Sequence, residues 1–193
     1  NYQGRVGDGT LTNRSSPVQI GALTTWATID CGDHQSFAIK TDGTMWCWGL
    51  NTYGHLGHGD TSQYSSPKQV GALTTWAKVG CGGQHVAAVK TDGTLWTMGY
   101  NNRGQLGDGS TTNRSSPAQV GSLTDWSTIQ GGVNNTFAVK TDSTFWSWGN
   151  GDVGALGHDS LSSISSPAQV GSLTNWSSNW TAAGSHTLAI KNE

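Results

Sequence analysis

Residues 40–49 read KTDGTMWCWG, and the same phrase returns as KTDGTLWTMG at 90–99 and as KTDSTFWSWG at 140–149. The tripeptide SSP keeps the same 50-residue step, with copies that start at Ser15, Ser65, Ser115 and Ser165. Self-similarity at a fixed period is the sequence signature of a repeat architecture. The 193 residues therefore form a single repeat domain, 1–193, that holds three whole repeats and most of a fourth.

Each period contains four short stretches that look like β-strands. In the first copy these stretches are Val18–Ile20, Trp26–Cys31, Gln35–Lys40 and Thr44–Gly49. Four strands per ~50 residues are typical of a propeller blade, whereas a solenoid period usually carries one or two strands or a helix pair. The sequence predicts an all-β propeller, or propeller arc, of about four four-stranded blades. Their expected boundaries are 18–49, 68–99, 118–149 and 168–191, with the last strand of the fourth blade missing.

The dipeptide Asp42-Gly43 favours a two-residue hairpin turn between the last two strands of the first blade. With that turn, Ile39 pairs with Trp46 on a bulky face of the sheet. Ala38 pairs with Cys47 on the small-residue face. Tandem sheets of this kind would bury both faces by stacking each bulky face on its neighbour's small one, which is radial packing of blades.

Most of the tryptophans keep the strand periodicity. We therefore interpret them as blade core, although aromatic faces can also bind sugars. The expected core tryptophans are Trp26, Trp46, Trp48, Trp76, Trp96, Trp126, Trp146, Trp148 and Trp176.

Composition excludes several classes of protein. The chain has 28 Gly, 10 Lys or Arg and 12 Asp or Glu, and this scarcity of good helix formers argues against a helical bundle. The net charge of −2 leaves no basic surface for nucleic acid. No apolar run approaches the ~18 residues that span a bilayer. We expect neither a nucleic-acid partner nor insertion into a membrane.

Candidate catalytic and metal-binding residues have simpler explanations. His58 and His158 occupy a loop position that Asp8 and Asp108 fill in the other copies, but each blade offers one such ligand and the loops lie far apart. The acidic residues that recur at Asp42 fall in the expected hairpin turns. No G-x-S-x-G nucleophile motif or P-loop occurs. We expect no catalytic residue, no metal site, no cofactor and no enzymatic activity.

Five loop residues are better candidates for contact with a partner, because Tyr and Arg are enriched in protein interfaces. They are Tyr53, Tyr64, Tyr100, Arg103 and Arg114.

Several phrases together resemble the regulator of chromosome condensation repeat family across essentially the whole chain. They are N-x-x-G-x-L-G-D/H-G at 51–59 and 101–109, D-G-T-x-W-x-W-G at 42–49, and AGSHTLA at 183–189. The resemblance implies a β-propeller, usually seven-bladed, that serves as an interaction platform. The founding member of the family is a nucleotide-exchange factor for a small GTPase, and other members bind other proteins or decorate larger assemblies. Fold therefore does not decide function.

This chain departs from the family pattern because its ends fall within a repeat. Asn1 aligns with Asn51, directly after the missing W-x-W-G strand, and Glu193 stops just before that strand would begin. Three arrangements follow: a piece of a longer propeller, completion by another chain, or four blades closed with one imperfect seam. An open arc would present a bulky Trp face at one end and a small-residue face at the other, which is a heterologous contact that builds rings or filaments.

These observations favour a non-enzymatic propeller that acts as an interaction or structural module, bound to a protein partner or to further copies or blades of the same assembly. Regular Ser/Thr/Gly-rich repeats are similar to those of bacterial and phage surface proteins. They favour a virion, appendage or cell-surface component that is extracellular or virion-associated. One alternative is a regulatory propeller that binds a small GTPase or another protein. The other is a lectin-like propeller with a glycan ligand. A lectin of this kind would require exposed Trp residues in equivalent loops.

Overall fold

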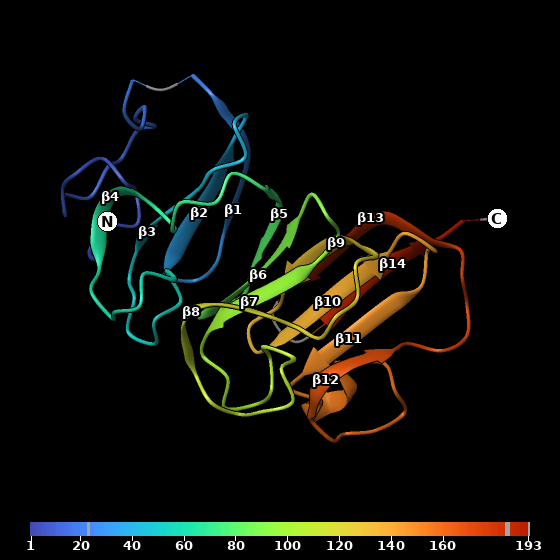
Figure 1. Cartoon of the computed structure of the whole chain (residues 1–193). Coiled ribbons are helices and arrows are strands. Elements are labelled where there is room, and N and C mark those ends of the chain that lie inside the picture. The colour runs from blue at the N-terminus through green and yellow to red at the C-terminus, as the bar shows by residue number, and fades with distance from the viewer. Residues whose placement is uncertain (23, 184–185, 193) are drawn as a thin grey trace.

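The computed structural model describes residues 1–22, 24–183 and 186–192, and it is built from β-strands (Figure 1). Residues 184 and 185, inside the AGSHTLA phrase, lie outside the described part. In that part the strands are β1 (Trp26–Cys31), β2 (Gln35–Lys40), β3 (Met45–Gly49), β4 (Tyr64–Gln69), β5 (Trp76–Cys81), β6 (His85–Lys90), β7 (Leu95–Gly99), β8 (Arg114–Gln119), β9 (Trp126–Gly131), β10 (Asn135–Lys140), β11 (Phe145–Gly149), β12 (Ile164–Gln169), β13 (Trp176–Ala183) and β14 (His186–Lys191). One short 3-10 helix spans Asp152–Gly154. Across the described ranges, no helix has the length and apolar character needed to cross a membrane.

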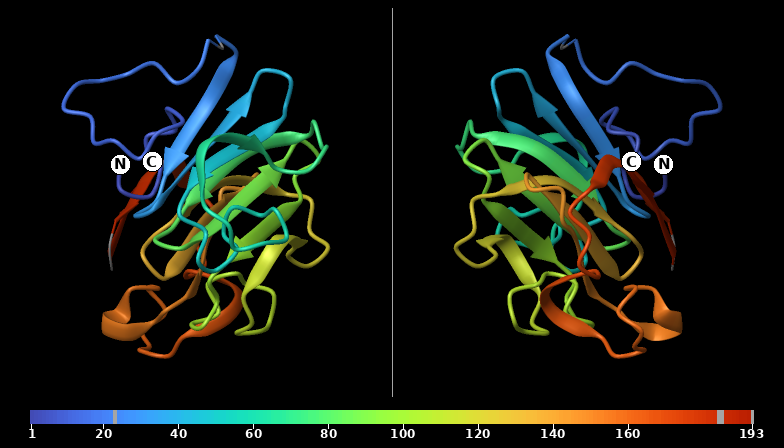
Figure 2. Two further views of the ribbon diagram at one scale, coloured as in Figure 1. Left: turned by 90° about the vertical axis from the view of Figure 1, so that its left-hand side faces the viewer. Right: turned by 90° about the vertical axis from the view of Figure 1, so that its right-hand side faces the viewer.

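The strands form antiparallel sheets that stand side by side in an arc. Their orders are β1-β2-β3-β4, β5-β6-β7-β8, β9-β10-β11-β12 and the pair β13-β14. We call them sheets 1 to 4. The N-terminus and the C-terminus lie at opposite ends of the arc in Figure 1, and Figure 2 views the arc from these two ends. The expected all-β blades with a 50-residue repeat are confirmed, and the last of them has two strands.

The strand pairing groups the repeat differently from the expected boundaries. Strands β1 and β2 have the expected bounds, but Val18–Ile20 is not a strand. Its counterpart in the next copy, β4, pairs antiparallel with the strand before it in the chain, β3, and Trp46 lies opposite Gln69. A complete sheet therefore runs from β1 to β4, and the SSP strand is its outer edge. An edge strand tolerates Pro67, which has no N–H to donate to a ladder.

The hairpin register differs by one residue from the prediction, so the predicted division into a bulky and a small face is wrong. The Lys40 N–H donates to the Thr44 carbonyl at 3.0 Å, which closes a three-residue loop rather than a two-residue one. Gly43 adopts φ 76°, the left-handed conformation that such a loop needs and that glycine adopts at little cost. As a result Ala38 pairs with Trp46, and Ile39 pairs with Met45.

Each sheet therefore has two mixed faces, which we name by the neighbour they meet. The backward face of sheet 1 carries Ala38, Trp46 and Trp48, and its forward face carries Phe37, Ile39, Met45 and Cys47. The forward face of sheet 1 packs on Val86, Ala88 and Met98 of the backward face of sheet 2. Sheets 2 and 3 meet in the same way through a second cluster, and sheets 3 and 4 through a third. Burial of apolar side chains between successive sheets holds the arc together.

The phrase K-T-D-G/S-T-x-W forms the same local network in sheets 1, 2 and 3. The Lys90 ammonium lies 3.5 Å from the centre of the Trp96 ring, and the Trp96 indole N–H donates to the Thr94 hydroxyl at 2.9 Å. That hydroxyl in turn donates to the Asp92 carboxylate at 2.6 Å. The Thr94 hydrogen bonds lower the pKa of Asp92. The recurring acidic residue therefore shapes the hairpin turn, and its partner Lys covers a tryptophan face.

All nine periodic tryptophans lie in the sheets. Trp48, Trp76, Trp126 and Trp148 are buried, whereas Trp26, Trp46, Trp96, Trp146 and Trp176 are half-buried.

Candidate interaction surfaces

Three of the loops that connect a third strand to the outer strand rest on the same hydrogen-bond frame, built on Asn1, Asn51 and Asn101. In the third copy, the Asn101 side-chain oxygen accepts from the Leu106 N–H at 2.9 Å, and its amide donates to the Thr112 carbonyl at 3.0 Å. Asn51 accepts from the Leu56 N–H in the same way, at 2.8 Å. The N-x-x-G-x-L-G phrase is therefore a structural frame that fixes the loop path.

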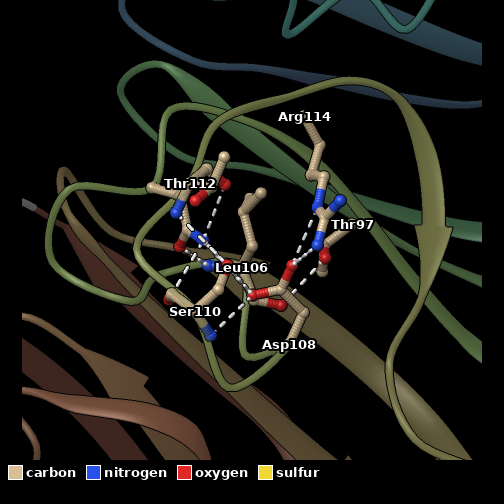
Figure 3. A network of polar contacts seen from close by, with 7 residues as sticks. Thr97, Leu106, Asp108, Ser110, Thr112 and Arg114 are labelled. Atoms are coloured by element: carbon tan, nitrogen blue, oxygen red, sulfur yellow. Dashed lines mark hydrogen bonds and ion pairs between the residues drawn. The ribbon is translucent and has the colours of Figure 1, made fainter.

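Asp108 ties the far side of this loop together (Figure 3). Its carboxylate accepts from the Ser110 N–H at 3.0 Å and from the Ser110 hydroxyl at 2.7 Å. Arg114 forms an ion pair with it at 2.9 Å. Burial of the carboxylate opposes the effect, but the hydrogen bonds from Ser110 and Arg114 lower the pKa of Asp108. One candidate contact residue, Arg114, is thus the first residue of strand β8 rather than a loop residue, and it is tied to the preceding loop, as Arg14 is held by Asp8 in the first copy.

Tyr64 occupies the same place as Arg114 in the first full blade. Its hydroxyl donates to the Asp60 carboxylate at 2.8 Å and accepts from the Lys68 ammonium at 2.5 Å. Its ring meets the His58 ring edge to face at 5.0 Å. Tyr64 is half-buried in this network, so a second candidate residue is engaged inside the loop.

The histidines at the Asp108 position contact the sheet. The His58 Nε2 atom lies 3.3 Å from the Cys47 sulfur, and the His158 Nε2 atom lies 2.9 Å from the Ser147 hydroxyl. Among the described residues, no group of three or more His, Cys, Asp or Glu side chains is arranged to hold a metal ion.

The other three candidates lie together on the loop surface. The rings of Tyr53 and Tyr100, from neighbouring loops, lie 4.4 Å apart between centroids. Arg103 extends toward the next loop, where its guanidinium lies 3.8 Å from the Asp152 carboxylate. Successive loops therefore contact one another through side chains that differ from copy to copy, and they form one continuous surface.

Two histidines lie in the interior beneath this surface. His55 and His85 have no exposed surface. The His85 Nε2 atom lies 2.9 Å from the Thr136 hydroxyl of the next blade. Burial lowers the pKa of each ring to about 4. Both are therefore neutral in the folded protein at pH 7.

The two ends of the arc expose faces that are buried everywhere else. On the backward face of sheet 1, Ile29 is 77% exposed, whereas its counterpart Ile129 is 7% exposed. A hollow of about 530 Å³ opens there, lined by Trp26, Ile29 and Trp48 among others. The Trp48 indole N–H donates to the Arg5 carbonyl at 2.9 Å, so the N-terminal loop partly covers this face.

At the other end, the forward face of sheet 4 is exposed. Leu188 is 67% exposed and Ile190 is 54% exposed, whereas the equivalent Phe137 and Val139 are 1% and 3% exposed. The expected Trp face is present at the N-terminal end, but the expected small-residue face at the C-terminal end is wrong. The corrected hairpin register brings Leu and Ile there. We did not predict Ile29, Leu188 or Ile190 as site residues. The signal that the sequence offered is that these residues lie in the first and last copies of the repeat.

Two protein-family models match the sequence of this chain. One, described as the regulator of chromosome condensation (RCC1) repeat, matches residues 42–89, 92–139 and 142–190. A second model of the same repeat matches 26–54 and 76–105. The chain belongs to the RCC1 repeat family. The RCC1 phrases in the sequence thus correspond to the blade cores and to the loop frames described above.

Solved structures share the RCC1-like fold. The crystal structure of human WBSCR16 is 21% identical and superposes with a TM-score of 0.88, covering 98% of this chain and 51% of that chain. Prp20p from Saccharomyces cerevisiae is 18% identical with a TM-score of 0.75, covering 89% of this chain and 45% of that chain. A complex of Kap60 with yeast RCC1 (Prp20) gives the same identity and TM-score. This chain therefore spans about half the length of these proteins. No curated protein matches it.

Proposed function

We propose that this RCC1-repeat propeller is a non-enzymatic module that binds a protein partner through the surface of the loops after the third strands. The observation that carries the proposal is the contrast between a recurring frame and positions beside it that vary from copy to copy. Two Gly positions recur in all four copies and the Asn and Leu positions in three each. The second position after the Asn site instead holds Gln3, Tyr53, Arg103 and Val153, of which Gln3 and Tyr53 are half-buried and Arg103 and Val153 are exposed. In repeat proteins, the face on which the copies differ is often the binding face.

The chemistry of this loop surface suits a protein. The Tyr53 and Tyr100 rings offer apolar area with polar ends, and Arg103 adds a charge that is half exposed. Tyr and Arg side chains contribute strongly to protein interfaces. The Arg103–Asp152 pair is long and exposed, so a partner can replace it at little cost.

The relatives give independent support. Prp20p is described by its binding properties to Gsp1p and histones, and yeast RCC1 was solved bound to Kap60. Protein binding is thus a use to which this fold is put. The non-enzymatic part of the proposal rests on the roles found for the recurring polar residues. Asp92 shapes a turn, and Asp108 and His158 hold loops.

The alternatives predict different ligands. A regulatory propeller would bind a small GTPase through the same loops, which makes it a narrower form of the proposal. A lectin-like propeller would use exposed loop tryptophans, but Trp46, Trp96 and Trp146 are half-buried under lysine side chains. The virion or cell-surface setting rests on the Ser/Thr/Gly-rich composition alone.

A binding screen tests the proposal. The labelled chain is applied to a protein array that includes histones and small GTPases, and in parallel to a glycan array. We expect protein ligands that are lost when Tyr53→Ala and Arg103→Ala are combined. The matched control is Leu123→Ala, an exposed residue at the opposite end of the blades, beside the 91–94 hairpin turn.

Protein binding that survives the double substitution would refute the loop surface as the site. Glycan binding without protein binding would instead support the lectin. Any GTPase that is retained is then tested in a nucleotide-exchange assay, where acceleration would establish the regulatory form and contradict the non-enzymatic description.

A further inference from the structure

Two of the loops that precede an outer strand are tied to a sheet by the same pair of side-chain bonds. The Gln105 carbonyl accepts from the Thr136 hydroxyl at 2.7 Å and from the Trp148 indole N–H at 3.0 Å. In the first copy, the Arg5 carbonyl accepts the corresponding bonds, at 3.1 and 2.9 Å, from Ser36 and Trp48. We call these two bonds the tethers of the loop.

The loop of residues 51–59, between β3 and β4, lacks both tethers. His55 takes the place of Gln105, and the side chains that correspond to the two donors are Val86 and Met98. Neither side chain has an N–H or O–H to donate. This loop is therefore attached to sheet 2 by two side-chain bonds fewer than its counterpart, the loop of residues 101–109, is to sheet 3.

Two buried histidines lie at the base of the untethered loop. His55 and His85 have no exposed surface, and both flank Gly99. A Cβ at Gly99 would lie 2.7 Å from the His55 Cβ and 2.9 Å from the His85 Cα. Gly99 directly precedes Tyr100, and Tyr53 lies two residues before His55. The paired Tyr53 and Tyr100 rings of the loop surface are thus supported by these two histidines.

The surroundings of both imidazoles do not accommodate a second proton. The Thr136 hydroxyl gives its one hydrogen to a backbone carbonyl, so the His85 Nε2 atom donates to the Thr136 oxygen. The His85 Nδ1 atom and both ring nitrogens of His55 have no hydrogen-bond partner among the described residues. Backbone groups of Leu50 and Asn135 oppose the effect of burial on the two pKa values, but neither reaches hydrogen-bond geometry. A buried imidazolium would therefore carry N–H groups without acceptors.

The ionisable groups that face the two rings add to this effect. His34, on the hairpin between β1 and β2, lowers the pKa of His55 further, and His55 lowers the pKa of His85. Within the described part of the chain, no Asp, Glu, Lys or Arg contributes to the pKa of either ring. The three imidazoles thus have no carboxylate that would stabilise their charged form.

A further histidine of the same loop acts in the same direction. Burial lowers the pKa of His58, Lys68 adds to the effect, and Asp60 opposes it. The His58 Nε2 atom lies 3.3 Å from the Cys47 sulfur, so the ring packs against sheet 1 while the loop is closed. Uptake of a proton by His58 therefore also disfavours the closed loop.

We propose that the loop of residues 51–59 is an acid-sensitive release device, which opens in mildly acidic solution, separates Tyr53 from Tyr100 and so releases the protein partner of the loop surface. The release rests on the proposed function, whereas the opening does not. Opening exposes His55 and His85, so protons that the closed loop excludes stabilise the open form. Between pH 7 and pH 5, a pKa of about 4 in the closed form and 6.5 in the open form favours opening by about 20-fold for one ring and about 500-fold for two.

Hydrogen exchange followed by mass spectrometry tests the opening without any partner. After correction for the intrinsic exchange rate at each pH, we expect the protection of residues 51–59 to fall by about 20-fold to 500-fold between pH 7 and pH 5. The loop of residues 101–109 is the internal control, because it keeps both tethers and carries Gln105 in place of His55. Its protection should change far less over the same range.

Two sets of substitutions assign the effect. His55→Gln combined with His85→Asn uses the residues that the chain carries at positions 105 and 135, and it should remove most of the difference between the two loops. Val86→Thr supplies a hydroxyl where Thr136 donates in the next blade, and it should raise the protection of residues 51–59 at both pH values. Leu123→Ala, which alters an exposed side chain, is the control and should respond as the native chain does.

Release is measured on the protein array, with its histones and small GTPases as probes, by binding the labelled chain at pH 7 and washing at pH 5. We expect the native chain to leave its ligand and the double histidine variant to stay bound. Equal release of both chains, or a native chain that stays bound at pH 5, would overturn the release.

The exchange data separate the opening from the proposed function. Equal loss of protection in the two loops, or a loss that persists in the double histidine variant, would overturn the acid-driven opening. Opening of residues 51–59 in a chain that binds no protein at pH 7 would support the device as a property of the fold and would overturn the loop-surface partner, and the release with it.

Discussion

Replacing His55 by Gln and His85 by Asn should remove a large part of the acid sensitivity of the propeller between pH 6.5 and pH 4. The substitutions use residues that the chain already carries at the equivalent positions, Gln105 and Asn135, so the shape of the interior is retained. Burial lowers the pKa of both histidines from 6.5 to about 4. Below pH 6.5 the unfolded chain then binds more protons than the folded chain, so the free energy of unfolding decreases as the pH is lowered.

The magnitude follows from these pKa values. A depression from 6.5 to about 4 corresponds to roughly 3 kcal/mol for each histidine once the pH reaches the folded-state pKa. Between pH 7.5 and pH 4.5 the native chain should lose about 5 kcal/mol in all from the two rings. That is a large share of the ~5–15 kcal/mol that stabilises a typical domain.

The carboxylates affect the stability in ways that differ from the histidine effect. The Thr10 hydroxyl lowers the pKa of Asp8 to about 2, so the stability that this carboxylate contributes is present above pH 4 and is lost only at lower pH. Burial raises the pKa of Asp30, which works against the histidine effect as the pH falls. Burial also lowers the pKa of His58, so that ring adds to the acid sensitivity between pH 6.5 and pH 4, and the comparison with the double variant isolates the share of His55 and His85.

Urea unfolding followed by tryptophan fluorescence at pH 7.5 and pH 4.5 measures the effect. The double variant should lose far less free energy of unfolding than the native chain over this range. Leu123→Ala alters an exposed, non-titrating side chain away from both rings and should keep the native acid sensitivity. Equal losses in the double variant and the native chain would refute the assignment.

Three stability changes test individual features of the blade. Ser143 has φ 61° at a position held by glycine in the first two copies, so Ser143→Gly should raise the free energy of unfolding by about 1 kcal/mol. Asp108→Ala removes the hydrogen bonds of the loop frame and should cost about 1–2 kcal/mol, whereas Asp152→Ala, in an exposed pair, should cost almost nothing. Trp148→Phe removes a buried indole that donates to the Gln105 carbonyl and should cost about 2–3 kcal/mol. Urea titration at pH 7.5 measures all of them.

The period and most strand bounds could be predicted from the sequence because they depend on local pattern. The bounds of β1 and β2 match the prediction, since alternation and β-branched content mark both ends of these strands. The register of the hairpin could not be predicted from the Asp-Gly pair. That pair serves two-residue and three-residue loops equally well, and Gly43 takes a left-handed conformation in either. A slip of one residue then moves every side chain to the other face.

The candidate site was only partly predictable, for a different reason. Tyr53, Tyr100 and Arg103 lie together on the loop surface, but Tyr64 and Arg114 have the same composition signal and turn inward to Asp60 and Asp108. Residue type alone does not reveal whether an Arg or Tyr in a loop has an acidic neighbour a few residues away that holds it. Comparison of the copies supplies that information, because Arg14 and Arg114 each follow an Asp by six residues.

The repeated copies serve as internal controls for what is structural and what is free to bind. A side chain that fills the same role in several blades, such as Trp148 donating to Gln105 as Trp48 does to Arg5, is explained by the fold. A side chain whose counterpart is buried while it is exposed has lost a neighbour rather than gained a function of its own. Ile29 is such a residue, because no described sheet packs on it as sheet 2 packs on Ile129. Exposed positions that vary among the loops have no counterpart to explain them, so the loop surface is where recognition of a different protein would be encoded.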